Sequence, residues 1–362
     1  MRNLLQFASV FFALVVATPT LFAQNDMKAK IDDIVQSTFS DDLPGVSVIV
    51  RKDGETLYRG AKGLANMELG IPIEPDMVFR IGSITKQFTA ASILLLEERG
   101  LLRVEDTIDK HLDYYPADQA SSITIDHLLA HTSGIVSYTG IPGYMMGDRI
   151  RRDLSTRELV DVFKDLNPVS SPGDEWAYNN SGYVLLGAII EAVSGQSYDE
   201  FVQANIFDKL GMNNSHYGSD TKVIPRRVDG YEVADDSINN ARFLSMSQPH
   251  AAGSLLSSVD DLAIWDDALF NGRVLSAESF EKMTRGGLLN NGEAHGYGYG
   301  FLISQDSDVK EVSHGGGIFG FATQGIHIVE EDLFVAVFSN GATRERNPAS
   351  VAREIVQVVL QR

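Results

Sequence analysis

The chain has 362 residues, no cysteine and a formal net charge of −19 at neutral pH. It is 44% hydrophobic and 22% charged, which is typical of a folded globular protein and not of a disordered one. The acidic residues are spread along the chain, so the charge predicts a solvated surface and argues against binding to nucleic acid or anionic lipid, which need basic patches. The absence of cysteine excludes disulfides, thiolate metal sites and a lipid-modified cysteine.

The first residues form an apolar run behind a single positive charge. Arg2 is followed by LLQFASVFFALVVATPTLFA and then by the polar QNDMKAK. This layout is typical of a secretory signal peptide, so we expect residues 1–23 to be cleaved off after Ala23. The alternative is a membrane anchor, but Thr-Pro-Thr at 18–20 interrupts the run and leaves barely enough apolar length to span a bilayer. The sequence therefore predicts a periplasmic or secreted protein, with no stable membrane insertion after signal cleavage.

The N-terminal part of the expected mature chain combines helices with a β-hairpin. DMKAKIDDIVQSTFS has apolar residues at helical spacing between 31 and 35. GVSVIVRKDGETLYRG contains two β-prone runs around Asp53-Gly54, a favoured hairpin turn pair. From Ile84 to Leu96 the apolar residues again recur at helical spacing, and Gly100 is the expected C-cap.

The middle of the chain is predicted to be helix and loop, and the C-terminal part returns to strands. The clearest helical pieces are TIDHLLAHTSGI, STRELVDVFKDL and SGYVLLGAIIEAVSG. TQGIHIVEEDLFVAVFSN predicts two strands joined by an acidic turn, and Asn347-Pro348 then begins a last helix. We therefore predict an α+β fold in residues 24–362. An antiparallel sheet would be built from both chain ends (about 24–80 and 290–362) and flanked by helices, with a mostly helical region (about 81–289) inserted between.

The segment RIGSITKQF places Ser83 three residues before Lys86, where glycine gives way to an apolar helical run. Helix positions three apart share one face. A lysine whose pKa is lowered by burial can take the proton of a serine hydroxyl, which is a poor nucleophile until then. The backbone N–H groups at the helix start are suited to hold an oxyanion. The spacing by itself is weak, because about one such pair is expected by chance, and an ordinary solvated pair explains it equally well.

Two further segments supply groups that would complete such a site. In PGDEWAYNNSGY, Tyr178 is suited to pass a proton to a leaving group, and Asn180 to donate to a substrate carbonyl and to the surroundings of a lysine. In VSHGGGIFGF, His314 begins a glycine-rich run whose backbone a substrate can approach closely. Taken singly, each segment also has a purely structural explanation, as a capped helix packed by Tyr178 and as a flexible turn with a lone histidine.

Together the three segments resemble the serine β-lactamase and penicillin-binding-protein superfamily. Within it, the chain is most similar to the branch of class C β-lactamases, D,D-carboxypeptidases, D-aminopeptidases and related esterases. The resemblance extends from about Asp32 to Ala342. It is carried, in family order, by FRIGSITKQFTAASILLLEERGLLRVEDTI, ITIDHLLAHTSGI, PGDEWAYNNSGYVLLGAIIEAVSGQSYDEFV, IFDKLGMNNSHYG, AAGSLLSSVDDLAIWDDAL, GYGYGF and SHGGGIFGF.

This resemblance implies a β-lactamase/transpeptidase-like fold and a set of roles. Ser83 matches the nucleophile that forms an acyl-enzyme, Lys86 the lysine that activates it, and Tyr178 the tyrosine taken as a base and proton relay. The resemblance assigns substrate binding to Asn180, His314, Gly316 and Gly317. It also places the oxyanion hole at the backbone N–H groups of Ser83 and Gly317. His131, in the family segment HTSG, matches a position that looks architectural. No cofactor and no metal are implied.

Two positions depart from the family pattern. His314 stands where β-lactamases have lysine, and a histidine is only partly charged near neutral pH. Gly315 stands where threonine is usual, and the lost hydroxyl would cost about 1.5–3 kcal/mol in recognition of a substrate carboxylate. Both changes favour an ester, or an amide recognised by its other end, over a carboxylate-bearing β-lactam or D-Ala-D-Ala peptide.

The sequence therefore predicts a secreted serine hydrolase that cleaves an ester or amide bond of a small molecule or peptide through an acyl-enzyme on Ser83. One alternative is a D,D-carboxypeptidase or a weak class C-like β-lactamase. A second alternative is a non-catalytic envelope binding protein, against which stands the presence of Ser83, Lys86 and Tyr178 together. No nucleic-acid partner is expected, and the sequence leaves the natural substrate and the oligomeric state open.

Overall fold

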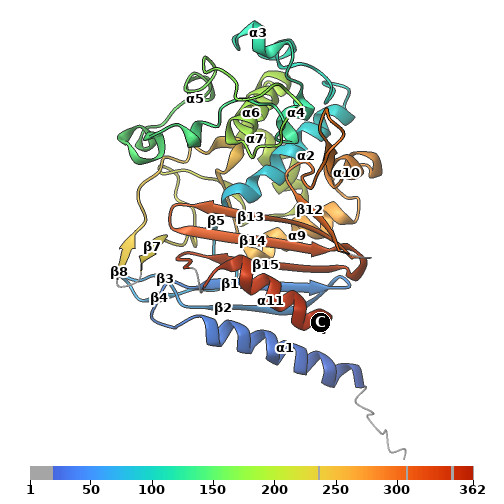
Figure 1. Cartoon of the computed structure of the whole chain (residues 1–362). Coiled ribbons are helices and arrows are strands. Elements are labelled where there is room, and N and C mark those ends of the chain that lie inside the picture. Colours follow the sequence, from blue (N-terminus) through green and yellow to red (C-terminus); the bar gives the residue numbers. More distant parts are fainter. Residues whose placement is uncertain (1–18, 235–236, 307–308, 344–345, 362) are drawn as a thin grey trace, which may run out of the picture.

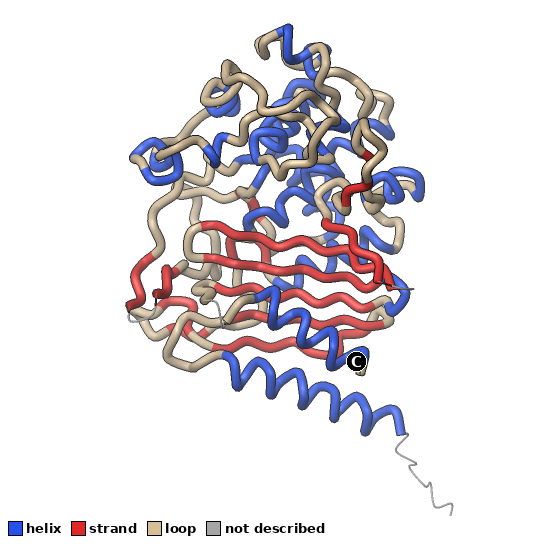
Figure 2. Tube along the Cα trace, in the orientation of Figure 1, coloured by secondary structure: helices blue, strands red, loops and turns tan. Residues whose placement is uncertain are grey.

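A computed structural model describes residues 19–234, 237–306, 309–343 and 346–361. Its central feature is a six-stranded sheet with the order β12-β13-β14-β15-β1-β2, in which every neighbouring pair is antiparallel (Figures 1 and 2). The strands of this sheet are β1 (Val46–Lys52), β2 (Glu55–Lys62), β12 (Leu302–Asp306), β13 (Val309–Ile318), β14 (Phe321–Ile328) and β15 (Leu333–Ser339). Because β1 pairs with β15, the first and last strands of the sheet lie side by side, so the sheet is built from both ends of the chain as predicted.

Shorter strands and the helices complete the structure. The short strands are β3 (Leu64–Asn66), β4 (Ile71–Pro72), β5 (Phe79–Arg80), β6 (His216–Tyr217), β7 (Tyr231–Ala234), β8 (Ser237–Asn240), β9 (Leu255–Ser257), β10 (Gly287–Leu288) and β11 (Ala294–His295). The helices are α1 (Pro19–Thr38), α2 (Thr85–Glu98), α3 (Ala117–Ala120), α4 (Ile125–Leu129), α5 (Thr156–Val160), α6 (Asn180–Ser194), α7 (Tyr198–Val202), α8 (Asp208–Leu210), α9 (Val259–Phe270), α10 (Ala277–Met283) and α11 (Pro348–Leu360). Two 3-10 turns matter for the site, η1 (Gly82–Ile84) and η7 (His250–Ala252).

The helices form two unequal layers around the sheet. The N-terminal α1 and the C-terminal α11 lie side by side on one face, and the helical region lies on the other side (Figure 1). Ile31, Ile34 and Val35 of α1 are buried in a core shared with the outward-facing side chains of the sheet and with α11. A second and larger core joins the other face of the sheet to α9 and to the central helices α2 and α6. The expected α+β arrangement is confirmed, with an antiparallel sheet built from both chain ends and helices on both of its faces.

Local signals in the sequence account for several element boundaries. Asp53 and Gly54 both have positive φ (52° and 76°), the backbone that a two-residue hairpin turn of this kind requires. The side chain of Asn347 accepts a hydrogen bond from the N–H of Ala349 at 2.9 Å and so caps α11. Gly100 has φ +70° just after α2, in agreement with the predicted end of that helix.

Two expectations differ from the structure or lie outside it. The segment STRELVDVFKDL forms only the five-residue α5 and then a series of tight turns, so the expected helix is shorter than predicted. Most of the expected signal peptide, residues 1–18, lies outside the described residues. Within the described part of the chain, no helix is long and apolar enough to cross a membrane.

Candidate active site

The candidate catalytic residues lie where three elements meet. Ser83 and Lys86 come from η1 and the first turn of α2, Asn180 is the first residue of α6, and Tyr178 precedes that helix. The third side of the site is the second half of β13. Because β12 pairs with β13 only as far as Ser313, residues 314–318 leave one backbone edge of this strand open to the site.

Gly82 brings the Ser83 turn against β13. Its φ of +53° favours glycine, and a Cβ at this position would lie 2.9 Å from the backbone nitrogen of Gly317. The two N–H groups expected to form the oxyanion hole, those of Ser83 and Gly317, therefore belong to backbones in close contact. A Cβ on Gly317 itself would meet no atom within 4 Å, so this residue faces open space.

Gly316 has a different structural role from Gly317. A Cβ at Gly316 would lie 2.0 Å from the carbonyl oxygen of Ile81, a contact that no side chain can make. The hydroxyl of Thr323, opposite Gly316 on β14, donates to the same oxygen at 2.9 Å. These contacts show that Gly316 allows η1 to pack closely on the sheet, and its expected part in substrate binding stays a prediction.

Lys86 is completely buried, and its amine contacts three oxygen atoms. Nζ lies 3.2 Å from the hydroxyl of Ser83, 2.9 Å from Oδ1 of Asn180 and 2.8 Å from the carbonyl oxygen of Ala252 in η7. Burial holds the pKa of Lys86 well below the usual lysine value. A neutral amine has two hydrogens and one lone pair, so donation to Asn180 and Ala252 leaves the lone pair for the Ser83 hydroxyl.

The Tyr178 ring lies beside the Lys86 amine. Lys86 Nζ is 4.8 Å from the centroid of the Tyr178 ring. Burial of the hydroxyl raises the pKa of Tyr178, and a hydrogen bond with Ser83 offsets this only in part. The residue as a whole is 39% exposed, so its ring is partly open to solvent while the hydroxyl is directed toward Ser83. At neutral pH Tyr178 is therefore a phenol that can relay a proton, and the stronger base of the pair is Lys86.

Asn180 orients the lysine. Its Oδ1 accepts from Lys86 and its Nδ2 donates to the hydroxyl of Thr139 at 3.0 Å. Its backbone N–H donates to the hydroxyl of Ser137 at 3.2 Å. With both ends of the amide occupied, the side chain can turn only one way, and it holds an oxygen toward the amine.

His314 is buried and uncharged, which corrects the expectation of a partial charge near neutral pH. Nε2 lies 3.0 Å from the hydroxyl of Tyr297, and Nδ1 lies 2.6 Å from the carbonyl oxygen of Gly315 and donates to it. Burial, together with the neighbouring Lys86, lowers the pKa of His314 to about 3. The sequence could not show this, because the pKa depends on the surroundings that the fold provides.

Gly315 has no positive φ, so its backbone is compatible with other residues. A Cβ there would lie 2.9 Å from Oε1 of Gln324, the residue opposite it on β14. The side chain of Gln324 thus lies beside the position where the family resemblance led us to expect threonine.

The contacts of His131 support the structural role that the family resemblance implies for it. Its Nδ1 accepts a hydrogen bond from the backbone N–H of Asn179 at 3.1 Å. Its ring packs against those of Tyr178 and Tyr297, with centroids 4.4 and 4.5 Å away. Burial holds the pKa of His131 well below its usual value, so the ring is a neutral support behind Tyr178.

A largely apolar cavity of about 390 Å³ opens beside Ser83. Its walls carry no formally charged side chain among the described residues, although the protein as a whole is strongly acidic. The lining includes Tyr138, Met145, Leu244, Pro249, Ile318 and Phe319.

Sequence reasoning missed two participants. Tyr297 lies in the segment GYGYGF, which was recognised as a family segment, but nothing in the pattern showed that its hydroxyl meets His314. Ala252 contributes only a backbone carbonyl, and a carbonyl leaves no signal in the type of residue that carries it.

This fold, with a buried lysine beside an accessible serine, defines the class of Ser-x-x-Lys serine hydrolases, and comparisons with known proteins agree. A family model described as Beta-lactamase matches residues 27–360. Penicillin-binding protein 4* of Bacillus subtilis (strain 168) is 31% identical over 310 residues, which are 81% of this chain and 67% of that protein. The chain belongs to the beta-lactamase family and is a serine hydrolase of the penicillin-binding-protein type.

Other similar proteins are named for amide chemistry or as penicillin-binding protein homologues. The D-aminopeptidase of Gluconobacter oxydans (strain 621H) is 29% identical over 305 residues, which are 82% of this chain but only 56% of that protein. The octameric penicillin-binding protein homologue from Pyrococcus abyssi has a TM-score of 0.78 and 30% identity, covering 93% of this chain and 77% of that one. A D-stereospecific amidohydrolase from Streptomyces sp. has a TM-score of 0.77 and 26% identity, covering 91% and 97%.

Two adjacent glycines offer a matched test of this geometry. Gly316→Ala should lower kcat/KM by at least about 100-fold and lower the melting temperature, because the new methyl collides with the Ile81 carbonyl and displaces Ser83. Gly317→Ala should keep the melting temperature of the unaltered protein, because its methyl meets open space. Thermal unfolding and ester-hydrolysis rates check both. Equal stability of the two variants would contradict the packing assigned to Gly316.

Proposed function

We propose that this protein is an exported serine hydrolase that cleaves ester or amide bonds through an acyl-enzyme on Ser83, with preference for uncharged, apolar acyl groups. The observation that carries the proposal is the buried amine of Lys86. It lies 3.2 Å from the Ser83 hydroxyl and is held by two further oxygen atoms that account for both hydrogens of a neutral amine.

Acylation begins with transfer of the Ser83 hydroxyl proton to the lone pair of Lys86. The serine oxygen attacks the substrate carbonyl carbon, and the carbonyl oxygen becomes an oxyanion between the N–H groups of Ser83 and Gly317. Lys86 is then an ammonium and shares a proton with the Tyr178 hydroxyl. That hydroxyl protonates the leaving alkoxide or amine, so the leaving group departs neutral and Lys86 returns to its uncharged form.

Deacylation uses the same groups in reverse. A water molecule at the position vacated by the leaving group gives a proton to the Tyr178–Lys86 pair and attacks the acyl carbon. The proton then returns to the Ser83 oxygen as the acid is released. Throughout these steps His314 stays neutral at neutral pH, because burial and the neighbouring Lys86 lower its pKa to about 3. In this proposal His314 supports the β13 edge through Tyr297 and adds no charge to the site.

The cavity beside Ser83 supports the choice of acyl group. The free energy of binding becomes more favourable by about 25 cal/mol for each Å² of apolar substrate surface that an apolar wall removes from water. The same wall has no charged side chain that could pair with a buried charge on the substrate. A free α-ammonium or carboxylate close to the scissile carbonyl would lose its hydration without compensation. The relatives named for D-amino acid chemistry therefore support the type of bond that is cleaved, an amide or ester. The cavity, in contrast, favours an acyl group that is apolar or whose amino group is blocked.

A carboxylate-recognising activity, such as that of a D,D-carboxypeptidase or β-lactamase, has less support. The position usually held by threonine is Gly315, with the amide of Gln324 beside it, and His314 provides no positive charge. Because of these two features, the β13 edge has less attraction for a substrate carboxylate.

The acyl-enzyme is tested with a fluorophosphonate probe and peptide mapping. Ser83 should be the labelled serine, and Ser83→Ala should abolish labelling. Lys86→Ala should slow labelling at least about 10³-fold, and Lys86→Ala with Tyr178→Phe should be little slower, because members of one catalytic unit are strongly non-additive. Labelling that persists in Ser83→Ala, or losses that multiply, would contradict the shared mechanism.

The acyl preference is tested with p-nitrophenyl esters of similar size. The butyrate should have a kcat/KM at least about 10-fold above that of the hemisuccinate, whose carboxylate would enter the uncharged cavity. Phe319→Ala should reduce the rate for the butyrate more than that for the acetate, since the longer acyl chain buries more apolar surface against the cavity wall. Equal rates for butyrate and hemisuccinate would exclude the proposed preference, while leaving the acyl-enzyme intact.

Export is supported by the apolar N-terminal run behind Arg2 and is tested by sequencing the N-terminus of the protein from a periplasmic or culture fraction. The mature chain should begin at Gln24 and keep the buried α1 residues Ile31, Ile34 and Val35. An intact N-terminus in the membrane fraction would instead identify the segment as an anchor.

A further inference from the structure

The turn η7 presents two consecutive carbonyl groups to the helix that carries the lysine. The carbonyl oxygen of Ala251 accepts a hydrogen bond from the hydroxyl of Thr89 at 2.7 Å. The carbonyl oxygen of Ala252 accepts one from Lys86 Nζ at 2.8 Å. The position of η7 relative to α2 therefore decides where one of the two fixed acceptors of the Lys86 amine lies.

His250 is the first residue of this turn, and its backbone is left-handed with φ +40°. For a residue other than glycine such a conformation costs on the order of 1 kcal/mol or more, and it persists only where the surroundings impose it. The turn is held within itself by the N–H of Gly253, which donates to the His250 carbonyl at 3.1 Å. Further restraint comes from the hydrogen bonds that Ala251 and Ala252 accept from α2, and from the His250 side chain.

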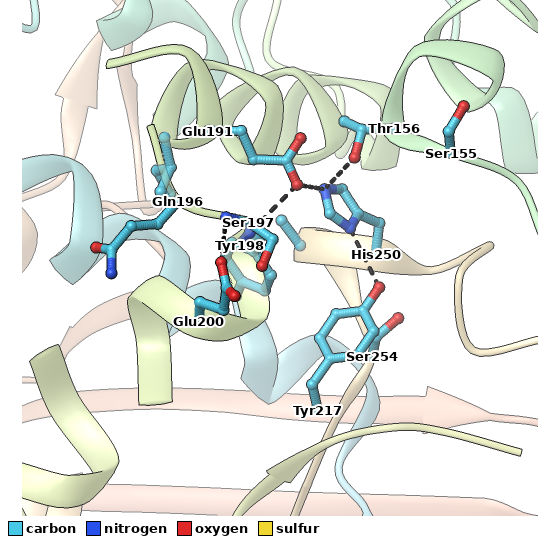
Figure 3. Close-up of polar contacts among 12 residues, drawn as sticks. Ser155, Thr156, Glu191, Gln196, Ser197, Tyr198, Glu200, Tyr217, His250 and Ser254 are labelled. Atoms are coloured by element: carbon cyan, nitrogen blue, oxygen red, sulfur yellow. Dashed lines mark hydrogen bonds and ion pairs between the residues drawn. The ribbon is translucent and has the colours of Figure 1, made fainter. Parts of the chain in front are cut away.

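That side chain is buried among groups from three other elements (Figure 3). Nδ1 lies 3.2 Å from the hydroxyl of Tyr217 in β6. On the other side of the ring, Nε2 lies 3.5 Å from the hydroxyl of Thr156 in α5 and 3.9 Å from Oε1 of Glu191 in α6. The carboxylate beside Nε2 favours a proton on that nitrogen, so Nδ1 accepts from Tyr217. Burial lowers the pKa of His250 to about 4, and the ring is neutral at neutral pH.

The helix that supplies Glu191 also supplies the second acceptor of the Lys86 amine. Asn180 begins α6 and Glu191 lies three turns further along it. Between them, Gly187 lets η7 approach, since a Cβ there would be 2.7 Å from both His250 Nε2 and the Ala251 side chain. The two acceptors, Asn180 Oδ1 and the Ala252 carbonyl, thus come from two elements that meet at His250.

We propose that His250 is a positioning residue for the catalytic base. By locking η7 onto α6 and β6 it fixes the separation of the two oxygen atoms that hold the Lys86 amine, and so directs the lone pair of that amine toward Ser83. His250 does not line the cavity beside Ser83, so it has no direct contact with substrate. The inference rests on the proposed function of Lys86 as the base.

The test compares His250→Ala with His250→Asn, using p-nitrophenyl butyrate across a pH range. His250→Ala should lower kcat by about 30-fold or more with little change in KM, because a misplaced amine is a poor base while the substrate cavity is intact. In the pH profile of kcat/KM, the acid limb should move to higher pH by at least about half a unit. A loosened turn admits water, the pKa of Lys86 returns toward its ordinary value, and a higher pH is then needed to uncharge it.

His250→Asn should recover most of the rate. Asparagine tolerates left-handed backbone better than alanine does, and its amide can reach the Tyr217 hydroxyl. Tyr217→Phe removes one hydroxyl without opening a cavity, so it should fold normally and shift the acid limb in the same direction by a smaller amount. The other titratable groups around the amine are unchanged in these variants: Tyr178, Tyr183, His131 and His314.

His327→Ala is the matched control. His327 is another buried histidine, on β14, and its Nδ1 lies 2.9 Å from Asp266 of α9. Its removal should lower the melting temperature and leave the acid limb in place. Rates are normalised to the fraction of enzyme labelled by the fluorophosphonate.

An unshifted acid limb in both His250→Ala and Tyr217→Phe would overturn the inference, as would equal rates for the alanine and asparagine variants. These results would leave the proposed function standing. Loss of Ser83 labelling in the unaltered protein would instead overturn the proposed function itself.

Discussion

The proposed active site depends on keeping one amine, that of Lys86, out of water and uncharged. Burial of Lys86 removes the hydration that would stabilise an ammonium, and no carboxylate among the described residues forms an ion pair with it. Three oxygen atoms surround the amine, and only one of them belongs to a group that can give up a proton in the reaction. The rest of the structure brings these oxygen atoms, from η1, α6 and η7, to the Lys86 amine.

The sheet provides the second constraint, which is close backbone approach. Gly82, Gly316 and Gly317 bring the turn that carries Ser83 against β13 without intervening side chains. Gly82 and Gly316 are needed for this packing, whereas Gly317 leaves the strand edge open. The Thr323 hydroxyl also donates a hydrogen bond to the Ile81 carbonyl, which helps to hold this turn on the sheet.

The surroundings of the site explain why membership in the family does not by itself decide the substrate. Related proteins are named for penicillin binding and for D-amino acid amide chemistry, and they share this fold. In this chain the histidine at 314 is neutral, the adjacent position is glycine, and the cavity beside Ser83 is uncharged. The chain thus carries the groups proposed for catalysis, while the described lining of the cavity has no charged side chain that would attract a charged substrate.

Local patterns in the sequence determined much of the fold. The Asp53-Gly54 turn, the Asn347 cap and the glycine after α2 depend on intrinsic backbone preferences, which act over a few residues and so can be predicted without knowing the fold. The family segments similarly determined which residues meet, because Ser83, Lys86, Tyr178 and His314 keep their order and spacing. Tertiary structure decided the rest. The charge state of His314, the packing part of Gly316, and the contacts of Ala252 and His250 all depend on atoms distant in sequence. Burial and backbone carbonyls leave no mark on residue type, so only the folded chain shows how the amine of Lys86 is held.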